Sequence, residues 1–231
     1  PVQTTGRAAA RPVVVGTGSA STLEAVELTQ HAAGAGAAAA AVLTPTAWHL
    51  DEDQLLGHYA SVANAVDLPI IVYNLPRMSG VNIRTDLVEQ LMIEQENIRG
   101  LIDVSDSLSQ LRQRVERLKD AQPDGVVLGG RAEHLLDLRL LGGDGVLSGN
   151  ANLSAAPAVR LDAALERGDH TAVLRYQGML LRMAGLESIR GAPPSVLKEA
   201  MAALGLIDHA TTRPPAFPLT GEGRAGVRQF V

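Results

Sequence analysis

Six short apolar runs, each followed by an amphipathic segment, organise this chain. The runs are rich in β-branched and aliphatic residues, as expected for strands that are buried on both faces. They cover residues 12–16, 37–44, 69–73, 98–102, 125–128 and 145–148. Strict alternation of strand and helix predicts a parallel sheet with right-handed crossover connections.

The amphipathic segments predict the helices. Ser21 followed by Glu24 forms a capping box at the start of the first one. The predicted helices cover residues 21–33, 51–65, 84–93, 107–118, 132–141 and 154–166, and two further segments cover 170–183 and 194–204 before a Pro-rich tail.

A closed barrel needs eight strand–helix units. Only six are visible here, so either the sheet is open or the chain is a (β/α)8 TIM barrel without its first two units, an interpretation that the abrupt start at Pro1 favours. Two open strand edges would invite aggregation, so we expect the missing segment in the native polypeptide or a partner that covers the gap. We expect a partial barrel over 1–153 and the last barrel helix, C-terminal helices and tail over 154–231, in one structural domain.

Composition excludes several classes of protein. The 231 residues are 46% hydrophobic, which is enough for one large core, and the net charge is −5. The basic series Arg112, Arg114, Arg117 and Lys119 is interleaved with acids, so no nucleic-acid partner is expected. Without cysteine there is no thiolate chemistry. No apolar run reaches the roughly 18 residues of a membrane span, so we expect no membrane contact and a cytoplasmic protein.

The stretch from Asp67 to Gly80 is the candidate site. Its strand ends on Tyr73 and Asn74, and the segment from Pro76 to Gly80 is predicted to prevent any further regular structure. A phenol is therefore delivered to the end of a buried strand, which is where parallel α/β sheets bind ligands. The alternative is a core tyrosine that hydrogen-bonds a backbone group.

Three other signals have simpler explanations beside the functional one. The loop Gly16-Thr-Gly-Ser resembles a phosphate cradle but also suits a barrel turn. The acids 51–53 with His49 and His58 suggest a metal site, although acids at a helix start complement its dipole. Ser105 could act as a nucleophile, but no histidine lies beside it. No metal or cofactor is expected.

Five motifs in order resemble the dihydrodipicolinate synthase / N-acetylneuraminate lyase family, and the similarity extends from about Gly6 to Arg224. They are Gly16-Thr-Gly-Ser, Thr44-Pro45, Tyr73-Asn-Leu-Pro, Gly100-Leu-Ile-Asp-Val-Ser and Gly145-Val-Leu-Ser-Gly-Asn-Ala-Asn. The resemblance implies a (β/α)8 barrel with a C-terminal helical extension, of which this chain starts near the third strand. It also implies a homo-oligomer, either a dimer or a tetramer.

The resemblance further implies a lyase or aldolase acting on a 2-keto acid. In the family a lysine at the end of the sixth barrel strand forms an imine with the keto group, and a tyrosine at the end of the fifth relays protons. Tyr73 matches that tyrosine, whereas Ile102 stands at the lysine position and has no amine. The chain has only two lysines, Lys119 and Lys198. The resemblance assigns substrate binding to Thr44, Arg77, Gly130 and Leu147, the arginine being shifted by one position.

Three functions remain open. The first is a divergent lyase or aldolase that acts on a 2-keto acid through Tyr73. The second is a repurposed enzyme that uses the same pocket without covalent catalysis, for a proton transfer, dehydration or cyclisation, on a more apolar ligand that suits Ile102. The third is a non-catalytic binding or assembly subunit.

Overall fold

The computed structural model describes residues 12–46, 50–105 and 107–231. It divides into two compact units. The first contains the described residues up to Gly130 together with 137–145, and the second contains 131–136 and 146–231. The predicted boundary between the partial barrel and the C-terminal part lay between residues 153 and 154. The expectation that both parts form one structural domain stays a prediction.

The sheet has six strands in the order β1-β2-β3-β4-β5-β6, and the pairs from β1 to β5 are parallel. The strands are β1 (Val14–Gly16), β2 (Ala39–Leu43), β3 (Ile70–Asn74), β4 (Ile98–Asp103), β5 (Val126–Gly129) and β6 (Gly145–Val146). Sequence order equals spatial order, as in a barrel wall. The predicted α/β fold of the barrel type, with consecutive parallel units and a helical C-terminal part, is confirmed.

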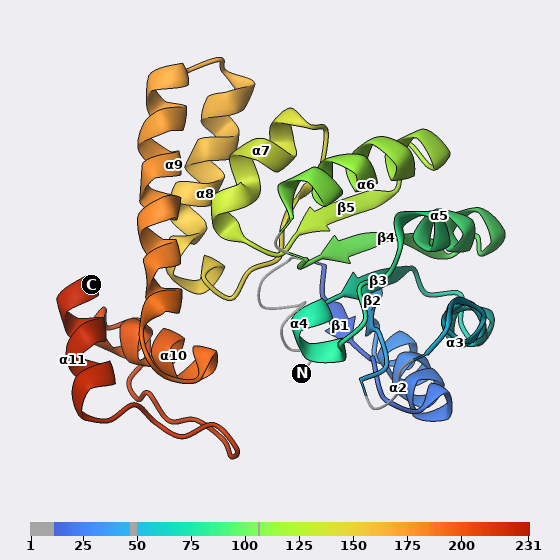
Figure 1. Ribbon diagram of the computed structural model, residues 1–231, viewed down its shortest axis with the longest axis horizontal. Helices are drawn as coiled ribbons and strands as arrows, with labels where there is room; N and C mark the ends of the chain where they lie inside the picture. The colour runs from blue at the N-terminus through green and yellow to red at the C-terminus, as the bar shows by residue number, and fades with distance from the viewer. Residues whose placement is uncertain (1–11, 47–49, 106) are drawn as a thin grey trace. The chain divides into compact units, whose positions relative to one another are not determined.

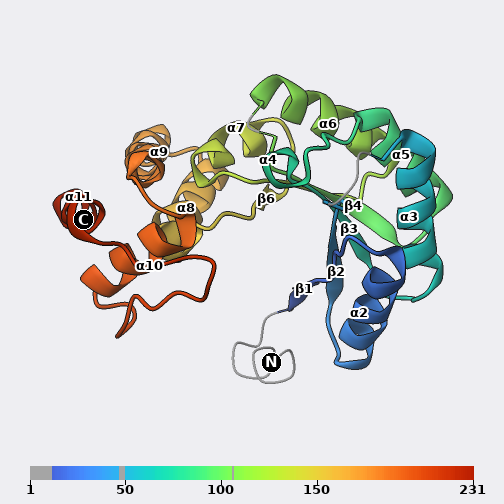
Figure 2. The same cartoon turned by 60° about the horizontal axis from the view of Figure 1, so that its bottom comes forward.

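Helices of the first unit follow one another along one face of the sheet (Figures 1 and 2). They are α2 (Thr22–Gly34), α3 (Glu52–Asn64), α5 (Thr85–Glu94) and α6 (Leu108–Ala121). The 3-10 turn η1 (Ala132–His134) belongs to the second unit, and the short helix α7 (Leu135–Leu140) after it returns to the first unit at Asp137. The Ser21 side chain caps α2, but the predicted capping box is incomplete because the Glu24 carboxylate accepts from the Ser19 hydroxyl instead. Asp51 forms a full capping box with Gln54 at the start of α3. The acids at 51–53 therefore serve the helix terminus.

The segment from Pro76 to Gly80 corrects the sequence prediction, because it forms a one-turn helix, α4 (Pro76–Ser79). Proline is tolerated in the first turn of a helix, where its missing N–H has no partner to lose. Gly80 then ends the turn at φ 73°, a left-handed conformation that favours glycine. The proline therefore starts a helical turn instead of preventing one.

The second unit is helical. It contains α8 (Ala151–Glu166), α9 (His170–Ala184), the 3-10 turn η2 (Gly185–Ser188), α10 (Pro193–Ala203) and α11 (Gly221–Phe230). Helix α11 differs from the prediction, since its residues read as part of the Pro-rich tail in the sequence. Its Val227 is fully buried in one apolar cluster with Leu219 and Val196, and Arg224 pairs with Glu199 of α10 at 3.0 Å. Tertiary packing thus stabilises a helix rich in glycine, a poor helix former.

Residues of the strands alternate between two faces. One face packs against the helices and includes Val42, Val72 and Leu101, which are fully buried. The other face carries Ala41, Ile71 and Ile102 in a separate apolar cluster, and α2, α3, α5 and α6 lie on the opposite side of the sheet in Figures 1 and 2. None of the described helices is long and apolar enough to cross a bilayer.

Candidate active site

Tyr73 and Ile102 occupy the same row of the sheet. Tyr73 pairs with Leu43 on β2 and with Ile102 on β4, and Ile102 pairs with Leu128 on β5. This row lies at the carboxyl end of the parallel strands, on the face opposite α2, α3, α5 and α6. The structure therefore brings together the two residues that the sequence analysis placed at the reaction centre.

The surroundings of Ile102 are apolar. Its side chain is 1% exposed and belongs to a cluster that includes the partly buried Tyr73, Val104 and Leu128. Lys119, the lysine of the first unit, donates to the Gly125 carbonyl at 2.7 Å, next to the opposite end of β5. Lys198 lies in the second unit and donates to the Thr211 carbonyl. No described lysine of the first unit lies at the carboxyl edge beside Tyr73.

The phenol of Tyr73 is partly buried, and its hydroxyl makes no hydrogen bond to any described residue. A core tyrosine bonded to backbone, the alternative considered from the sequence, would show such a bond. Burial raises the pKa of Tyr73 above its ordinary value of 10.0 because the anion loses hydration. At neutral pH the group is thus a neutral phenol that can donate a proton.

The backbone of Tyr73 is held from the β2 side by Thr44. The Thr44 amide donates to the Tyr73 carbonyl at 3.3 Å, and the Thr44 hydroxyl lies 3.4 Å from the same oxygen. That hydroxyl also lies 3.4 Å from the hydroxyl of Tyr59, and Thr44 is 1% exposed. Thr44 therefore positions Tyr73, and its contact with a substrate remains a prediction.

Other predicted substrate-binding residues are more dispersed. Arg77 is exposed on α4, directly after the strand that carries Tyr73. Gly130 follows β5, and a Cβ atom there would lie 2.5 Å from a methyl group of Val104. Only glycine therefore lets these two segments approach so closely. Leu147 belongs to the second unit and is 41% exposed. The roles of these residues remain predictions.

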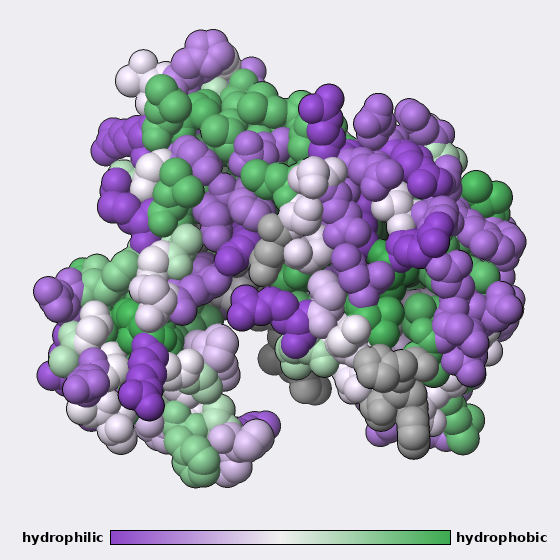
Figure 3. Space-filling model, viewed as in Figure 1, coloured by the Kyte–Doolittle hydropathy of each residue, from purple (hydrophilic) through white to green (hydrophobic). Residues whose placement is uncertain are grey.

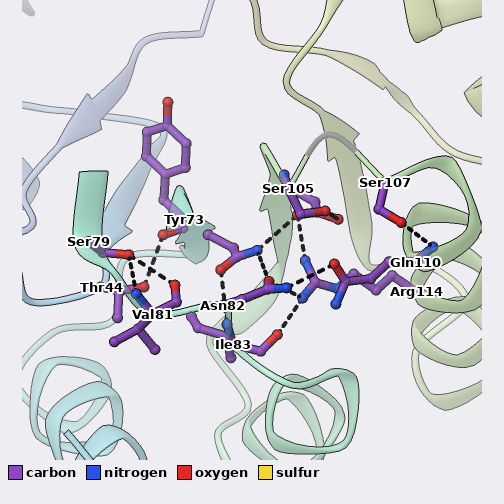
Figure 4. A network of polar contacts seen from close by, with 12 residues as sticks. Thr44, Tyr73, Ser79, Val81, Asn82, Ile83, Ser105, Ser107, Gln110 and Arg114 are labelled. Atoms are coloured by element: carbon purple, nitrogen blue, oxygen red, sulfur yellow. Dashed lines mark hydrogen bonds and ion pairs between the residues drawn. The ribbon is translucent and has the colours of Figure 1, made fainter. Parts of the chain in front are cut away.

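A buried polar network lies behind the row, on the helix-covered face (Figure 4). Asn74 and Asp103 are register partners, and the Asn74 amide nitrogen donates to Asp103 Oδ1 at 2.9 Å. Arg114 of α6 pairs with that oxygen at 2.5 Å, and both side chains of the ion pair are at most 1% exposed. Tyr73 points away from this network in Figure 4.

Arg114 was missed as a site residue, because it was treated as one of a basic series. The signal that could have found it is its spacing, since Arg114 lies three residues after Leu111 and four before Leu118, which are both buried. These positions share one helix face. A buried arginine on that face needs a carboxylate partner, because an unpaired buried charge is costly. Asp103 is the last residue of the preceding strand and is the acid available.

The structure also bears on the glycine loop after β1, the suggested metal site and Ser105. The Thr17 amide donates to the Ala41 carbonyl at 3.0 Å, and a Cβ atom at Gly18 would lie 2.5 Å from the Leu43 nitrogen, so strand packing explains this glycine. Among the described residues, which do not include His49, no three histidines or acids gather as metal ligands. Ser105 donates its hydroxyl hydrogen to Asp103 Oδ2 at 3.0 Å.

Parallel units in sequence order, with a neutral phenol beside apolar side chains at the carboxyl edge, define a barrel-type α/β protein. Proteins of this class bind their ligands at the carboxyl ends of the strands. Comparison with known proteins specifies the class further. The sequence profile described as the Dihydrodipicolinate synthetase family matches residues 4–231. The chain belongs to this family, and its relatives include proteins named as aldolases, as a 4-hydroxy-tetrahydrodipicolinate synthase and as a DapA-like lyase.

Individual relatives agree with this assignment. The chain is 34% identical over 220 residues to the putative 2-dehydro-3-deoxy-D-gluconate aldolase YagE of Escherichia coli K12, covering 95% of this chain and 73% of the relative. It is 37% identical to a 4-hydroxy-tetrahydrodipicolinate synthase of Methanothrix thermoacetophila, over 95% and 73% of the two chains.

Solved structures share the fold. The crystal structure of YagE in complex with pyruvate has a TM-score of 0.92 at 33% identity, covering 99% of this chain and 76% of that one. Dihydrodipicolinate synthase of Thermotoga maritima has a TM-score of 0.91 at 26% identity, covering 99% and 78%.

Proposed function

We propose that this protein binds a 2-keto acid at the carboxyl edge of the sheet and promotes a lyase or aldolase reaction without forming an imine. One observation carries the proposal, the pairing of the neutral phenol of Tyr73 with the buried, amine-free side chain of Ile102. Two related aldolases by name, and the pyruvate complex of YagE, support a 2-keto acid as the ligand.

Tyr73 acts as a hydrogen-bond and proton donor in this proposal. When a 4-hydroxy-2-keto acid is cleaved, its 4-hydroxyl gives its proton to water and the C4–O bond becomes the carbonyl of an aldehyde. The electrons of the broken C3–C4 bond form the C2=C3 bond of an enolate, and the electrons of the keto C=O bond move onto the keto oxygen. The phenol donates to this oxygen as negative charge develops there, and donors in a dry site stabilise such charge strongly. Burial keeps the phenol protonated because it raises the pKa of Tyr73.

The apolar side chains around Tyr73 support a second candidate function. Val104 and Leu128 are only partly buried beside Tyr73 and pack around the buried Ile102, and this apolar environment suits a larger, less polar ligand than pyruvate. In that case the phenol would assist a proton transfer, dehydration or cyclisation in the same place. Binding of an aliphatic 2-keto acid such as 4-methyl-2-oxopentanoate, with no binding of pyruvate, would favour this candidate.

Calorimetric titration with pyruvate, followed by borohydride treatment and mass spectrometry, tests the proposal. We expect binding without a covalent adduct. Tyr73→Phe should weaken binding about tenfold, because it removes a hydrogen bond worth about 1.4 kcal/mol. Tyr176→Phe in the second unit is the matched control and should leave binding unchanged.

A pyruvate adduct on either lysine, or equal binding by Tyr73→Phe, contradicts the proposal. Failure to bind either 2-keto acid leaves a non-catalytic binding or assembly subunit.

We also propose that the chain forms a homo-oligomer in the cytoplasm, as the family resemblance implies. The second unit exposes apolar side chains on α8 and α9, namely Val159, Leu174 and Leu181, and Figure 3 shows hydrophobic surface over this helix pair. Sedimentation velocity should report a dimer or tetramer that Leu174→Glu dissociates. Leu23→Glu, at an equally exposed leucine of α2, is the control. A monomeric parent protein contradicts this proposal.

A further inference from the structure

The buried network behind the sheet is not used by the chemistry proposed above, although it lies directly behind the reacting row. Asn74 follows Tyr73 and Asp103 follows Ile102 in the chain, so the two members of each pair point to opposite faces of the sheet. Hydrogen bonds that fix Asn74 and Asp103 on the helix-covered face therefore also fix the backbone of Tyr73 and Ile102, which point to the opposite face.

Asn74 connects three segments. Its amide nitrogen donates to Asp103 Oδ1 on β4 and to Asn82 Oδ1 in the segment after α4, at 2.9 Å in each case. Its amide oxygen accepts from the Ile83 backbone nitrogen at 3.0 Å. Both donor hydrogens of the amide are used, so the chain from β3 to Ile83 closes a loop onto the strand end.

Arg114 extends the same connection to α6. Besides its ion pair with Asp103, it donates to Asn82 Oδ1 at 3.2 Å and to the Ile83 carbonyl. The guanidinium therefore bridges β4 and the loop that returns from α4. Its Nε and Nη1 atoms make no hydrogen bond of good geometry within the part of the chain that the structure describes.

Burial is costly for this pair. Desolvation, only partly offset by Asp103, lowers the pKa of Arg114 below its ordinary value. A buried ion pair of this kind is weak evidence for stability, because apolar replacements of both partners are often equally stable. Its directional contacts fix geometry, which an apolar pair of the same volume would not do.

We propose that Asp103, Arg114, Asn74 and Asn82 are positioning residues, which hold the ends of β3 and β4 in register so that the phenol of Tyr73 stands in a single orientation beside Ile102. This role rests on the proposed function of Tyr73, and it adds residues that touch no substrate. Thr44 holds the same backbone from the β2 side. Tyr73 is thus fixed from both neighbouring strands.

Fluorine NMR of protein labelled with 3-fluorotyrosine tests the proposal without any substrate. The chain has three tyrosines, and Tyr73→Phe assigns the signal of interest. The double variant Asp103→Asn with Arg114→Met removes both charges at similar volume. Asn82→Ala is a milder change at an exposed residue, because it removes only the Asn82 side-chain hydrogen bonds of the network. We expect the Tyr73 signal to shift and broaden in both variants, while the signals of Tyr59 and Tyr176 stay in place.

Leu111→Ala is the matched control, since it weakens the packing of α6 without touching the network. It should lower the unfolding midpoint and leave the Tyr73 signal unchanged. An unchanged Tyr73 signal in Asn82→Ala and in the double variant overturns the proposal, and so does an equal change in Leu111→Ala. If the double variant does not fold, Asn82→Ala alone decides. Because no ligand is added, loss of pyruvate binding would refute the proposed function and leave this result intact.

Discussion

Ile102 stands beside Tyr73 as its register partner on the neighbouring parallel strand, on the face of the sheet opposite α2, α3, α5 and α6. The phenol and the apolar side chain share one short stretch of the carboxyl edge. A reactive group introduced at position 102 would therefore be delivered next to the tyrosine.

Ile102→Lys should introduce imine chemistry. Burial among Val104, Leu128 and Tyr73 lowers the pKa of a lysine there, so part of it is a neutral nucleophile near neutral pH. We expect a borohydride-trapped pyruvate adduct on this residue and a loss of stability of about 1–3 kcal/mol. Ile102→Met, without an amine, should form no adduct. A folded Ile102→Lys protein that remains unmodified would show that pyruvate does not reach this edge.

Arg114→Met should be strongly destabilising by itself. It leaves the Asp103 carboxylate buried without its cation, which typically costs about 3–5 kcal/mol. Adding Asp103→Asn should recover at least half of this loss, because the uncompensated charge is then removed. Urea unfolding of the two single variants and the double variant measures the coupling. Strictly additive losses would mean that the two side chains do not act as a pair.

Gly100→Ala should disrupt the β4–β5 pairing. A Cβ atom at this position would lie 1.9 Å from the Val126 carbonyl oxygen, and the backbone must move to relieve the clash. We expect a loss of about 3 kcal/mol in the free energy of unfolding.

Gly57→Ala in α3 is the matched control. Nothing lies within 4 Å of the position that its new methyl group would take, and alanine is the better helix former, so a gain of about 0.5–1 kcal/mol is expected. Thermal unfolding compares the two variants. Equal effects would contradict the assignment of Gly100 to a close approach of two strands.

Stability should decline at alkaline pH because of Tyr59. The side chain is fully buried, and desolvation raises its pKa well above 10.0 despite the bond to Thr44. Below about pH 10 the phenol is protonated in both the folded and unfolded states. Above it the unfolded state ionises first, so the free energy of unfolding falls as the pH rises toward the folded pKa.

Tyr59→Phe tests this reasoning. It should cost about 1 kcal/mol at neutral pH through the lost bond to the Val42 carbonyl, and it should flatten the alkaline decline. Urea unfolding at about pH 8 and about pH 10.5 gives the comparison. Tyr176→Phe serves as the control. A decline as steep in Tyr59→Phe as in the parent protein would place the responsible group elsewhere.

Much of the fold was predictable because its signals are local. Apolar runs and helix caps predicted the strands and most helices to within a few residues, and the predicted starts at Ser21 and Asp51 are the N-cap residues of α2 and α3. The predictions for the segment after Tyr73 and for α11 were wrong, because there the tertiary packing outweighs the local preferences of proline and glycine. Pro76 begins a helical turn, and α11 forms because Val227 is buried against the core of the second unit.

The sequence by itself determined the order of the parallel units, the phenol at the end of β3 and the lack of an amine at position 102, since these depend on side-chain identity and short-range periodicity. Only the tertiary structure decided that Tyr73 lies beside Ile102 with a hydroxyl that bonds to no described residue, and that Arg114 turns inward to Asp103. Register and burial arise from contacts between residues far apart in the chain, and such contacts outweigh local preference when a core closes around them.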